Sequence, residues 1–338
     1  MLLEIKTLQK YDKESMYKIY DDWPTLAQGS YESENQVREF KEIKQIVFAG
    51  MGGSGTVGDI FSSILSSTNI QVDVVKGYRL PKTISQNTLI VTTSVSGNTA
   101  ETITILENAI KQRMNIIAFS SGGKMIELCK KNKITHRIIP QKLNPRSSLV
   151  VYLYSMLKVL NEIIPITDDE IDLSIKKLTE SKKNICSENL TSNNLSLKIA
   201  ESIGEIPLIY FPSGLSSAAI RFKNSLQENS KIHVIAEDVI ESCHNGIVGW
   251  EKISESIKPI LIQGYDDNIH TKKHWRILKE FFDEKNVKYN EMKSLEGDIL
   301  TKIINLIYVL DYASIYLAII NKTNPFPVEP INFIKKRI

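Results

Sequence analysis

The sequence predicts an α/β protein with two doubly wound parallel-sheet domains, built on one duplicated plan. The chain has 338 residues, enough for about two domains. Short apolar runs alternate with longer helical periodicities, a pattern typical of parallel strands covered by helices on both faces. The order of strand, turn and helix near residues 46–65 occurs again near residues 208–226.

The first half contains five short apolar runs that we expect to be strands. They are residues 45–49, 72–75, 88–93, 115–119 and 135–139. Helical periodicity occupies residues 55–66 and 99–113, and a long apolar helix is expected over residues 143–163. These elements predict an N-terminal domain of residues 1–163.

Residues 164–204 are expected to form a helical connector. Thr167 and Glu170 have the spacing of a capping box at the start of a charged helix. The polar stretch 187–196 has no periodicity, so we place the domain boundary there. The C-terminal domain is then residues 205–338. Its expected strands and long apolar helix are residues 207–211, 231–235, 258–263, 287–291 and 298–321.

Composition excludes several classes of function. Lys and Arg number 42 and Asp and Glu 39, giving a net charge of +3, and only residues 335–337 form a short basic block, so nucleic acid is not an expected partner. The apolar run 304–310 stops at Asp311, too short to cross a bilayer. Three cysteines without metal-type spacing fit reduced thiols, and the N-terminus lacks the pattern of a signal peptide. We expect a cytoplasmic protein without a membrane partner.

The first glycine-rich turn, GMGGSG at residues 50–55, follows an apolar run and opens a helix. It satisfies the dinucleotide fingerprint, and Asp73 lies about 20 residues further on. Asp73, however, sits within the run 72–75 and not at its C-terminal end. A nucleotide-dependent oxidoreductase therefore stays an alternative, and one that leaves the second turn unexplained.

The second turn, SVSGNT at residues 94–99, also lies between an apolar run and a helix. A helix N-terminus presents unpaired N–H groups that bind anions, and hydroxyl groups add neutral donors. Ser94, Ser96 and Thr99 should therefore converge with Ser54 at the C-terminal edge of the sheet. The alternative for each turn is ordinary N-capping by Ser or Thr. No P-loop is present, since GGK at residues 122–124 is followed by Met125.

At this point the chain resembles the sugar isomerase (SIS) fold and, within it, the bifunctional phosphoglucose/phosphomannose isomerases of archaea and bacteria. Besides the two turns, the matching segments are NPRS at 144–147, KNSLQEN at 223–229, CHNGIVG at 243–249 and residues 327–336. The resemblance covers nearly the whole chain after about residue 40.

The resemblance implies an aldose–ketose isomerase that interconverts glucose 6-phosphate, and possibly mannose 6-phosphate, with fructose 6-phosphate through a cis-enediolate, without cofactor or metal. The phosphate would be bound by Ser54, Ser94, Ser96 and Thr99 with the backbone of Gly52 and Gly53. The chemistry would be carried by Glu228, His244, Arg146 and Lys335. In this family the ring-opening histidine comes from the neighbouring subunit, which implies a homodimer.

Residue chemistry agrees with these roles. Proton transfer next to a carbonyl needs a carboxylate base, and Glu228 lies between two amide side chains in a helix-like segment. Ring opening near neutral pH suits a histidine, and His244 lies in an irregular glycine-containing segment. A guanidinium such as that of Arg146 keeps its charge next to an enediolate. His270 and His274 have i,i+4 spacing, but without a third ligand they do not predict zinc.

Three questions stay open at this level. Lys336 is close enough to Lys335 to confuse which lysine matches the family. Phe326 stands in the Pro325 to Val328 element, where dual-epimer enzymes tend to have Thr or a similar polar residue. A sensor that binds a sugar phosphate without turnover is the alternative function, although it would not need Glu228.

Overall fold

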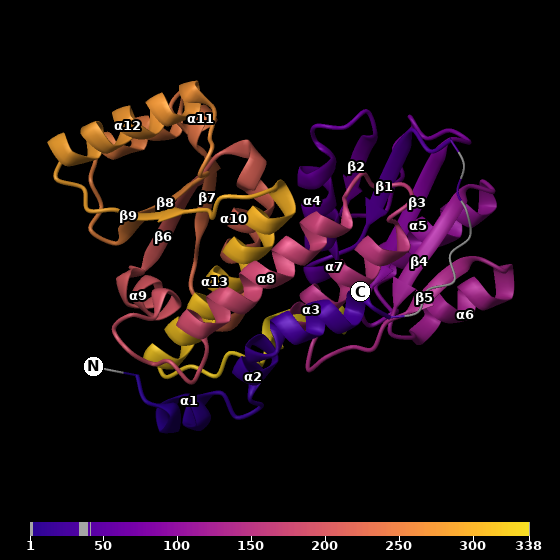
Figure 1. The fold of residues 1–338 in the computed structure, drawn as a ribbon, viewed down its shortest axis with the longest axis horizontal. Coiled ribbons are helices and arrows are strands. Elements are labelled where there is room, and N and C mark those ends of the chain that lie inside the picture. The colour runs from indigo at the N-terminus through magenta and orange to yellow at the C-terminus, as the bar shows by residue number, and fades with distance from the viewer. Residues whose placement is uncertain (1–2, 34–39, 41, 338) are drawn as a thin grey trace. The chain divides into compact units, whose positions relative to one another are not determined.

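The computed structural model describes residues 3–33, 40 and 42–337, which divide into two compact units (Figure 1). The N-terminal unit comprises residues 22–175. The C-terminal unit comprises residues 1–21 together with 176–338. Each unit contains one parallel sheet with helices packed on it, so the predicted fold class is confirmed.

The sheet of the N-terminal unit has the strand order β2-β1-β3-β4-β5, and every pairing is parallel. Its strands are β1 (Gln45–Ala49), β2 (Gln71–Val75), β3 (Thr88–Ser94), β4 (Asn115–Ser120) and β5 (Thr135–Ile138). The central strands β1 and β3 are buried at every position, which is why their apolar runs predicted them closely.

Helices cover both faces of this sheet. They are α3 (Trp23–Tyr31), α4 (Gly53–Leu65), α5 (Ala100–Lys111), α6 (Gly123–Asn132) and α7 (Leu149–Val159). Figure 1 shows α4 and α7 on one side and α5 and α6 on the other. The helix expected over residues 143–163 is shorter than predicted: a 3-10 turn, η1 (Arg146–Ser148), precedes α7.

Helix α8 (Asp168–Ile185) begins with the expected capping box, because Thr167 N donates to Glu170 Oε2 (2.8 Å) and Glu170 N donates to Thr167 Oγ1 (3.3 Å). The division between units falls within α8 and not at residues 187–196. That polar stretch is well bonded: Asn194 caps α9 (Leu195–Ser202) by accepting from Leu197 N (2.9 Å), and its amide donates to Asn189 O (2.8 Å).

The first 21 residues belong to the C-terminal unit, so the predicted domain of residues 1–163 is wrong at its start. These residues form α1 (Ile5–Tyr11) and α2 (Met16–Asp21), which pack on α13 (Ile299–Ile320). Tyr308 Oη donates to Tyr20 O (2.8 Å), and Tyr312 Oη donates to Tyr17 O (3.2 Å). Such long-range bonds leave no periodic signal in the sequence.

The sheet of the C-terminal unit has the order β7-β6-β8-β9 and is also parallel. Its strands are β6 (Ile206–Phe211), β7 (Ile235–Asp238), β8 (Ile257–Gln263) and β9 (Asn290–Lys293). Helices α10 (Ser216–Ser225) and α13 lie on one side, and α11 (Val239–Ser242) and α12 (Ile269–Glu284) on the other (Figure 1). The two edge strands, β7 and β9, were expected at 231–235 and 287–291, and both begin later than predicted.

Helix α13 agrees with the long apolar helix expected over residues 298–321. It continues through Asp311, whose carboxylate is fully buried against Arg221, so the charge does not end the helix. Among the described residues it is the one helix long and apolar enough to span a bilayer, but 94% of its apolar stretch is buried in the protein. We therefore assign α13 as a core helix.

Candidate functional site

The two turns that the sequence singled out lie next to each other in the N-terminal unit. The backbone N–H of Val95, in the second turn, donates to Oγ of Ser54 in the first (3.3 Å). Within the second turn the hydroxyls of Ser94 and Thr99 are 2.9 Å apart, and Gly97 N donates to Ser94 Oγ (3.1 Å). The structure thus brings Ser54, Ser94 and Thr99 together, as parallel strand ends predict.

Neither turn is an ordinary N-cap. Helix α4 begins after Gly52, which has no side chain to cap it. Helix α5 begins after Thr99, whose side chain makes no cap hydrogen bond. The Thr99 hydroxyl is instead bonded to Ser94. Ser96 is exposed, next to the buried Ser94. The N-termini of α4 and α5 therefore have backbone N–H groups without a side-chain cap, at the neighbouring ends of β1 and β3. This arrangement suits an anion.

Close backbone contacts explain the glycines of these turns. Gly97 has a φ of +69°, and a Cβ there would lie 1.8 Å from Gly122 O. A Cβ on Gly50 would lie 2.9 Å from Thr93 O, and one on Gly55 would lie 2.8 Å from Gly50 O. A side chain on Gly50 would push the first turn away from the end of β3, one on Gly97 would collide with the turn after β4, and one on Gly55 would collide with the first turn itself.

A third turn, after β4, braces the second, and the sequence analysis missed it. Ser121 Oγ donates to Val95 O (2.6 Å), Met125 N to Gly97 O (2.9 Å) and Lys124 N to Asn98 Oδ1 (3.1 Å). The pair Gly122-Gly123 had been considered only as a failed P-loop. These two glycines mark a further glycine-rich turn between a strand and a helix, at the end of the strand next to β3.

Arg146 lies beside the first turn. A Cβ added to Gly53 would be 3.4 Å from Arg146 Cα, so the two backbones are in contact. Arg146 is buried (4% exposed) in η1, and Asn144 Oδ1 accepts from Ser147 N (2.9 Å) to fix that turn. The NPRS motif is thus a small bonded unit that brings the backbone of a buried arginine next to the turn predicted to bind phosphate.

The alternative of a dinucleotide-binding site lacks the acidic residue that it needs. Asp73 lies in the middle of β2, opposite Val47 of β1. Its Oδ2 accepts from the amides of Gln45 (2.8 Å) and Gln71 (3.3 Å). A carboxylate bound in this way within the strand is not placed to bind a ribose, which in Rossmann folds needs an acid after the strand end.

Glu228 lies in a π-helical turn, η3 (Leu226–Ser230), which continues α10 directly. The helix predicted over residues 221–229 is therefore present but ends in a wider turn. Glu228 itself is half-buried, between the buried residues Leu226 and Asn229. Lys231, with a φ of +60°, ends the turn, and its ammonium group donates to Glu228 O and to Pro325 O (3.3 Å). The turn is thereby tied to the segment that carries Phe326.

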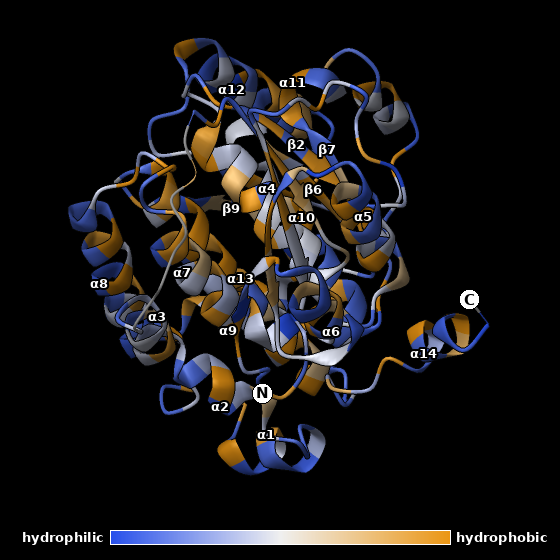
Figure 2. Cartoon of the chain, turned by 90° about the vertical axis from the view of Figure 1, so that its right-hand side faces the viewer, coloured by the Kyte–Doolittle hydropathy of each residue, from blue (hydrophilic) through white to orange (hydrophobic). Residues whose placement is uncertain are grey.

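His244 and Lys335 lie on other elements of the same unit. His244 is exposed, between α11 and η4 (Gly246–Glu251), and a Cβ on Gly246 would lie 2.5 Å from Glu237 Oε2. Lys335 ends α14 (Glu329–Lys335), a helix without buried residues, labelled near the C-terminus in Figure 2. That these residues act together with Glu228 stays a prediction.

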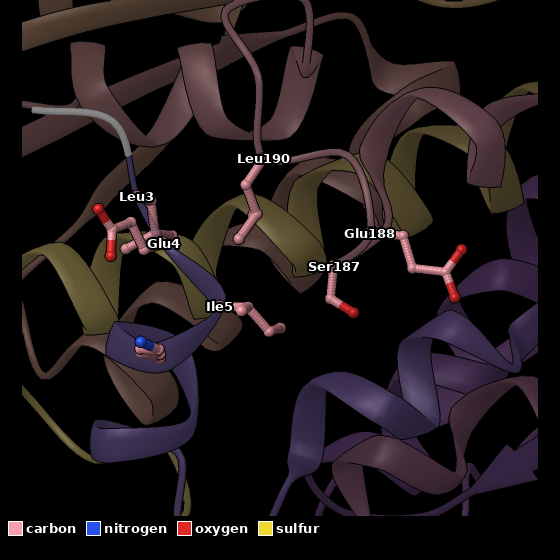
Figure 3. Close-up of a pocket in the computed structure, with 7 residues that line it drawn as sticks. Leu3, Glu4, Ile5, Ser187, Glu188 and Leu190 are labelled. Carbon is pink, nitrogen blue, oxygen red and sulfur yellow. The ribbon is translucent and has the colours of Figure 1, made fainter.

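Two hollows in the C-terminal unit lie apart from every predicted site residue. One, of about 600 Å³, is shown in Figure 3, and its lining is Leu3, Glu4, Ile5, Lys6, Ser187, Glu188 and Leu190. Its two glutamates and apolar walls do not suit a phosphate. The other, of about 200 Å³, lies beside the loop between β8 and α12 and is lined in part by Asp267 and Trp275.

That loop is the counterpart of the turn at residues 94–99 in the N-terminal unit, since β8 has the same place in its sheet as β3. Here the carboxylate of Asp267 accepts from Gly264 N (2.9 Å) and from Trp275 Nε1 (2.9 Å). The C-terminal unit thus fills its own turn with an internal carboxylate. The counterpart turn at residues 94–99 has a cluster of hydrogen-bonded hydroxyl groups instead.

Comparison with known proteins gives a separate family match for each of the two parts of the chain. Residues 39–158 match the SIS domain family, and residues 192–338 match the family described as bacterial phospho-glucose isomerase C-terminal SIS domain. Among solved structures, a hypothetical protein from Thermus thermophilus superposes with a TM-score of 0.72 at 13% identity, covering 98% of this chain and 91% of that one. This likeness shows the fold alone.

Curated relatives extend over almost the whole chain. The bifunctional phosphoglucose/phosphomannose isomerase of Aquifex aeolicus is 30% identical over 331 residues, which is 96% of this chain and 98% of the relative. The protein of the same name from Caldicellulosiruptor bescii is 29% identical over 337 residues, with the same coverage. The chain therefore belongs to the family of bifunctional phosphoglucose/phosphomannose isomerases.

Proposed function

We propose that this chain interconverts glucose 6-phosphate and fructose 6-phosphate as an aldose–ketose isomerase that needs no cofactor. The observation that carries the proposal is the pair of hydrogen-bonded turns whose helix N-termini have no side-chain cap. A phosphate monoester is the kind of anion that such N–H groups and hydroxyls bind. Membership of the isomerase family narrows that anion to a sugar phosphate.

The 6-phosphate would be bound by neutral groups. Its ligands are the hydroxyls of Ser54, Ser94, Ser96 and Thr99 and the backbone of Gly52 and Gly53. Ser94 and Ser96 lie at and just after the end of β3, Ser54 lies in the first turn of α4, and Thr99 immediately precedes α5. Recognition of this kind explains how a chain with a net charge of only +3 can select a dianion.

The chemistry needs one base and one fixed cation. Glu228 would take the proton from C2 of the open-chain aldose and deliver a proton to C1 of the cis-enediolate, so that no redox partner is needed. Arg146 would balance the negative charge of the enediolate. His244 and Lys335 would exchange protons with the ring oxygen and the C1 hydroxyl during ring opening. A non-catalytic sensor is not favoured, because the relatives are isomerases.

Mannose 6-phosphate is proposed as a second substrate, since the curated relatives are named for both epimers. Phe326 stands where the family tends to have a polar residue. It is partly buried, its backbone N–H donates to Asn324 Oδ1 (2.9 Å), and its neighbour Pro325 is tied to Lys231. A panel of both aldose 6-phosphates, assayed as kcat/KM, tests the epimer preference. We also propose a cytoplasmic homodimer, which light scattering tests for its oligomeric state.

A coupled assay with glucose 6-phosphate and fructose 6-phosphate tests the function. Ser94→Ala removes one of the two paired hydroxyls of Ser94 and Thr99. We expect the KM for either sugar phosphate to rise at least tenfold, the equivalent of about 1.4 kcal/mol of lost binding. Thr104→Ala is the matched control, because its hydroxyl lies on α5, the helix that follows the turn, but donates to Ala100 O on the exposed face. Stabilisation by fructose 6-phosphate without any turnover in the wild type would instead identify a sensor.

The base is tested separately. Glu228→Gln keeps the size of the side chain but cannot accept a proton, so kcat should fall about 10² to 10⁴-fold. Exchange of the C2 hydrogen of the substrate with deuterated solvent, followed by NMR, should stop as well. Turnover at the wild-type rate in this variant would exclude Glu228 as the base.

A further inference from the structure

The turn that carries Glu228 has a conformation that a helix does not adopt by itself. Residues Leu226–Ser230 form a π turn at the end of α10. π-helical turns are rare, are less well bonded than α-helical turns and are frequent at functional sites. Something outside the turn must therefore stabilise it, and its neighbour in the fold is α13, with which it makes many contacts.

Two side chains of the turn bond to one serine of α13. Asn229 Nδ2 donates to Ser314 Oγ (2.8 Å), and Ser230 Oγ donates to Ser314 O (2.6 Å). The Ser314 hydroxyl in turn donates to Asp311 O (2.6 Å). Asn229, Ser230 and Ser314 are all buried, at 0%, 3% and 0% exposure, so water does not compete with these bonds.

The preceding turn of α10 is held by the same face of α13. Arg221 Nη2 lies 2.7 Å from Asp311 Oδ2, and its Nε donates to the same carboxylate (3.1 Å). Ser225 Oγ donates to Asp311 Oδ1 (2.5 Å). Arg221 and Asp311 are 2% and 0% exposed. Burial alone would lower the pKa of Arg221, but the charge of Asp311 outweighs this and raises it, so the guanidinium stays charged.

Glu228 lies between these two sets of bonds. Ser225 is fixed three residues before it, and Asn229 and Ser230 are fixed immediately after it, while the Glu228 side chain is only half-buried. If the turn relaxed to an α-helical one, the residues after Leu226 would change direction around the helix axis. Small displacements of a reacting group can cost about 10²-fold in rate.

We propose that Asp311 and Ser314 of α13 are positioning residues for the catalytic carboxylate of this isomerase. They hold the π turn in register and so fix the direction of Glu228, without touching the substrate. The inference rests on the proposed role of Glu228 as the base. It adds a reason for polar residues in the middle of an otherwise apolar helix.

The test is Ser314→Ala in the full-length protein. The variant removes the acceptor of the Asn229 bond and leaves a void of one oxygen atom. We expect kcat to fall about tenfold or more with KM for fructose 6-phosphate changed less than about twofold, because the phosphate turns are in the other unit. Ser314→Thr keeps the hydroxyl and should recover much of the lost kcat. The pH dependence of kcat/KM should also shift at its acidic limb, which reports the base.

Ser196→Ala is the matched control. Its hydroxyl is equally buried (0% exposed) and also bonds to α13, by donating to Val309 O (2.8 Å), but it has no bond to the π turn. It should lower the melting temperature without a selective change in kcat. Ser230→Ala removes the second bond of the turn and should reproduce the effect of Ser314→Ala on kcat, even if the first variant is too unstable to assay.

The outcomes separate the two hypotheses. Wild-type kcat in both Ser314→Ala and Ser230→Ala would overturn the positioning role, as would an equal loss of kcat in Ser196→Ala. Absence of isomerisation by the wild-type protein, or full activity of Glu228→Gln, would instead refute the proposed function or its base. The positioning role is supported only by a kcat-selective loss that the hydroxyl of threonine restores.

Discussion

Cys129 shows how burial changes the chemistry of a single residue here. It lies on α6, in the core between the sheet and helices α5 and α6, with no exposed surface. Burial raises the pKa of its thiol from 9.0 to about 11. The folded protein therefore keeps this thiol protonated at a pH where the unfolded chain would lose the proton.

This shift predicts a loss of stability in alkali. Below pH 9 both states carry the proton, so the contribution of Cys129 is complete. Between pH 9 and about pH 11 only the unfolded state ionises, and the free energy of unfolding should fall by about 1.4 kcal/mol per pH unit from this group. Guanidinium denaturation of the wild type and of Cys129→Ala should show their difference shrinking over this range. A difference that stays constant with pH would contradict the shift.

The candidate site was predictable where it depends on strand ends. Ser54, Ser94 and Thr99 could be grouped from the sequence, because the C-terminal ends of adjacent parallel strands meet at one edge. The contact of Gly97 with Gly122 could not, since it depends on how closely two loops approach. The bonds of Ser314 lie 84 and 85 residues from their partners and leave no local pattern.

At the level of elements, the buried strands were the most predictable. β1, β3 and β8 follow their apolar runs closely, because strands covered on both faces need apolar residues at every position. The edge strands β7 and β9 were misplaced by several residues. They are short and only partly buried, so their sequences alternate weakly and resemble loops.

The loop between β8 and α12 gives a prediction at this scale. Asp267→Ala would leave Gly264 N and Trp275 Nε1 without their acceptor, at a cost of about 1–3 kcal/mol in the free energy of unfolding. Glu280→Ala on α12 is the control. Its carboxylate pairs with Arg276 (3.3 Å), and both side chains are exposed, so its loss should cost about 0–1 kcal/mol. Thermal unfolding of both variants measures the difference, and equal losses would show that Asp267 does not hold the loop.

At the level of the whole molecule, the chain crosses between its units twice. Residues 1–21 and 176–338 form one compact unit, and residues 22–175 form the other. The sequence predicted two α/β domains correctly but could not assign the first helices. Their attachment is made by buried tyrosines and by Asp21, whose carboxylate accepts from Ser187 N (3.0 Å) and Ser187 Oγ (2.7 Å).

Truncation tests that assignment. Removal of residues 1–21 would uncover the surface of α13 that now covers Leu8, Met16, Tyr17 and Tyr20. At about 1.5–3 kcal/mol per buried side chain, the loss of stability should be at least about 5 kcal/mol and should be confined to the C-terminal unit. Hydrogen exchange resolved by peptide can localise it. Removal of residues 329–338, where α14 has no buried side chain, should leave exchange in both units unchanged.

The internal carboxylate of Asp267 has a consequence for stoichiometry. A group attached to the chain is present at an effective concentration that a free anion in solution rarely reaches. The loop after β8 is therefore occupied by its own side chain, whereas no internal carboxylate is bonded to the hydroxyls of Ser94 and Thr99 in the described part of the turn after β3. Under the proposed function only the turn after β3 takes a ligand from solution, so titration with fructose 6-phosphate should give one equivalent per chain at this pair of turns.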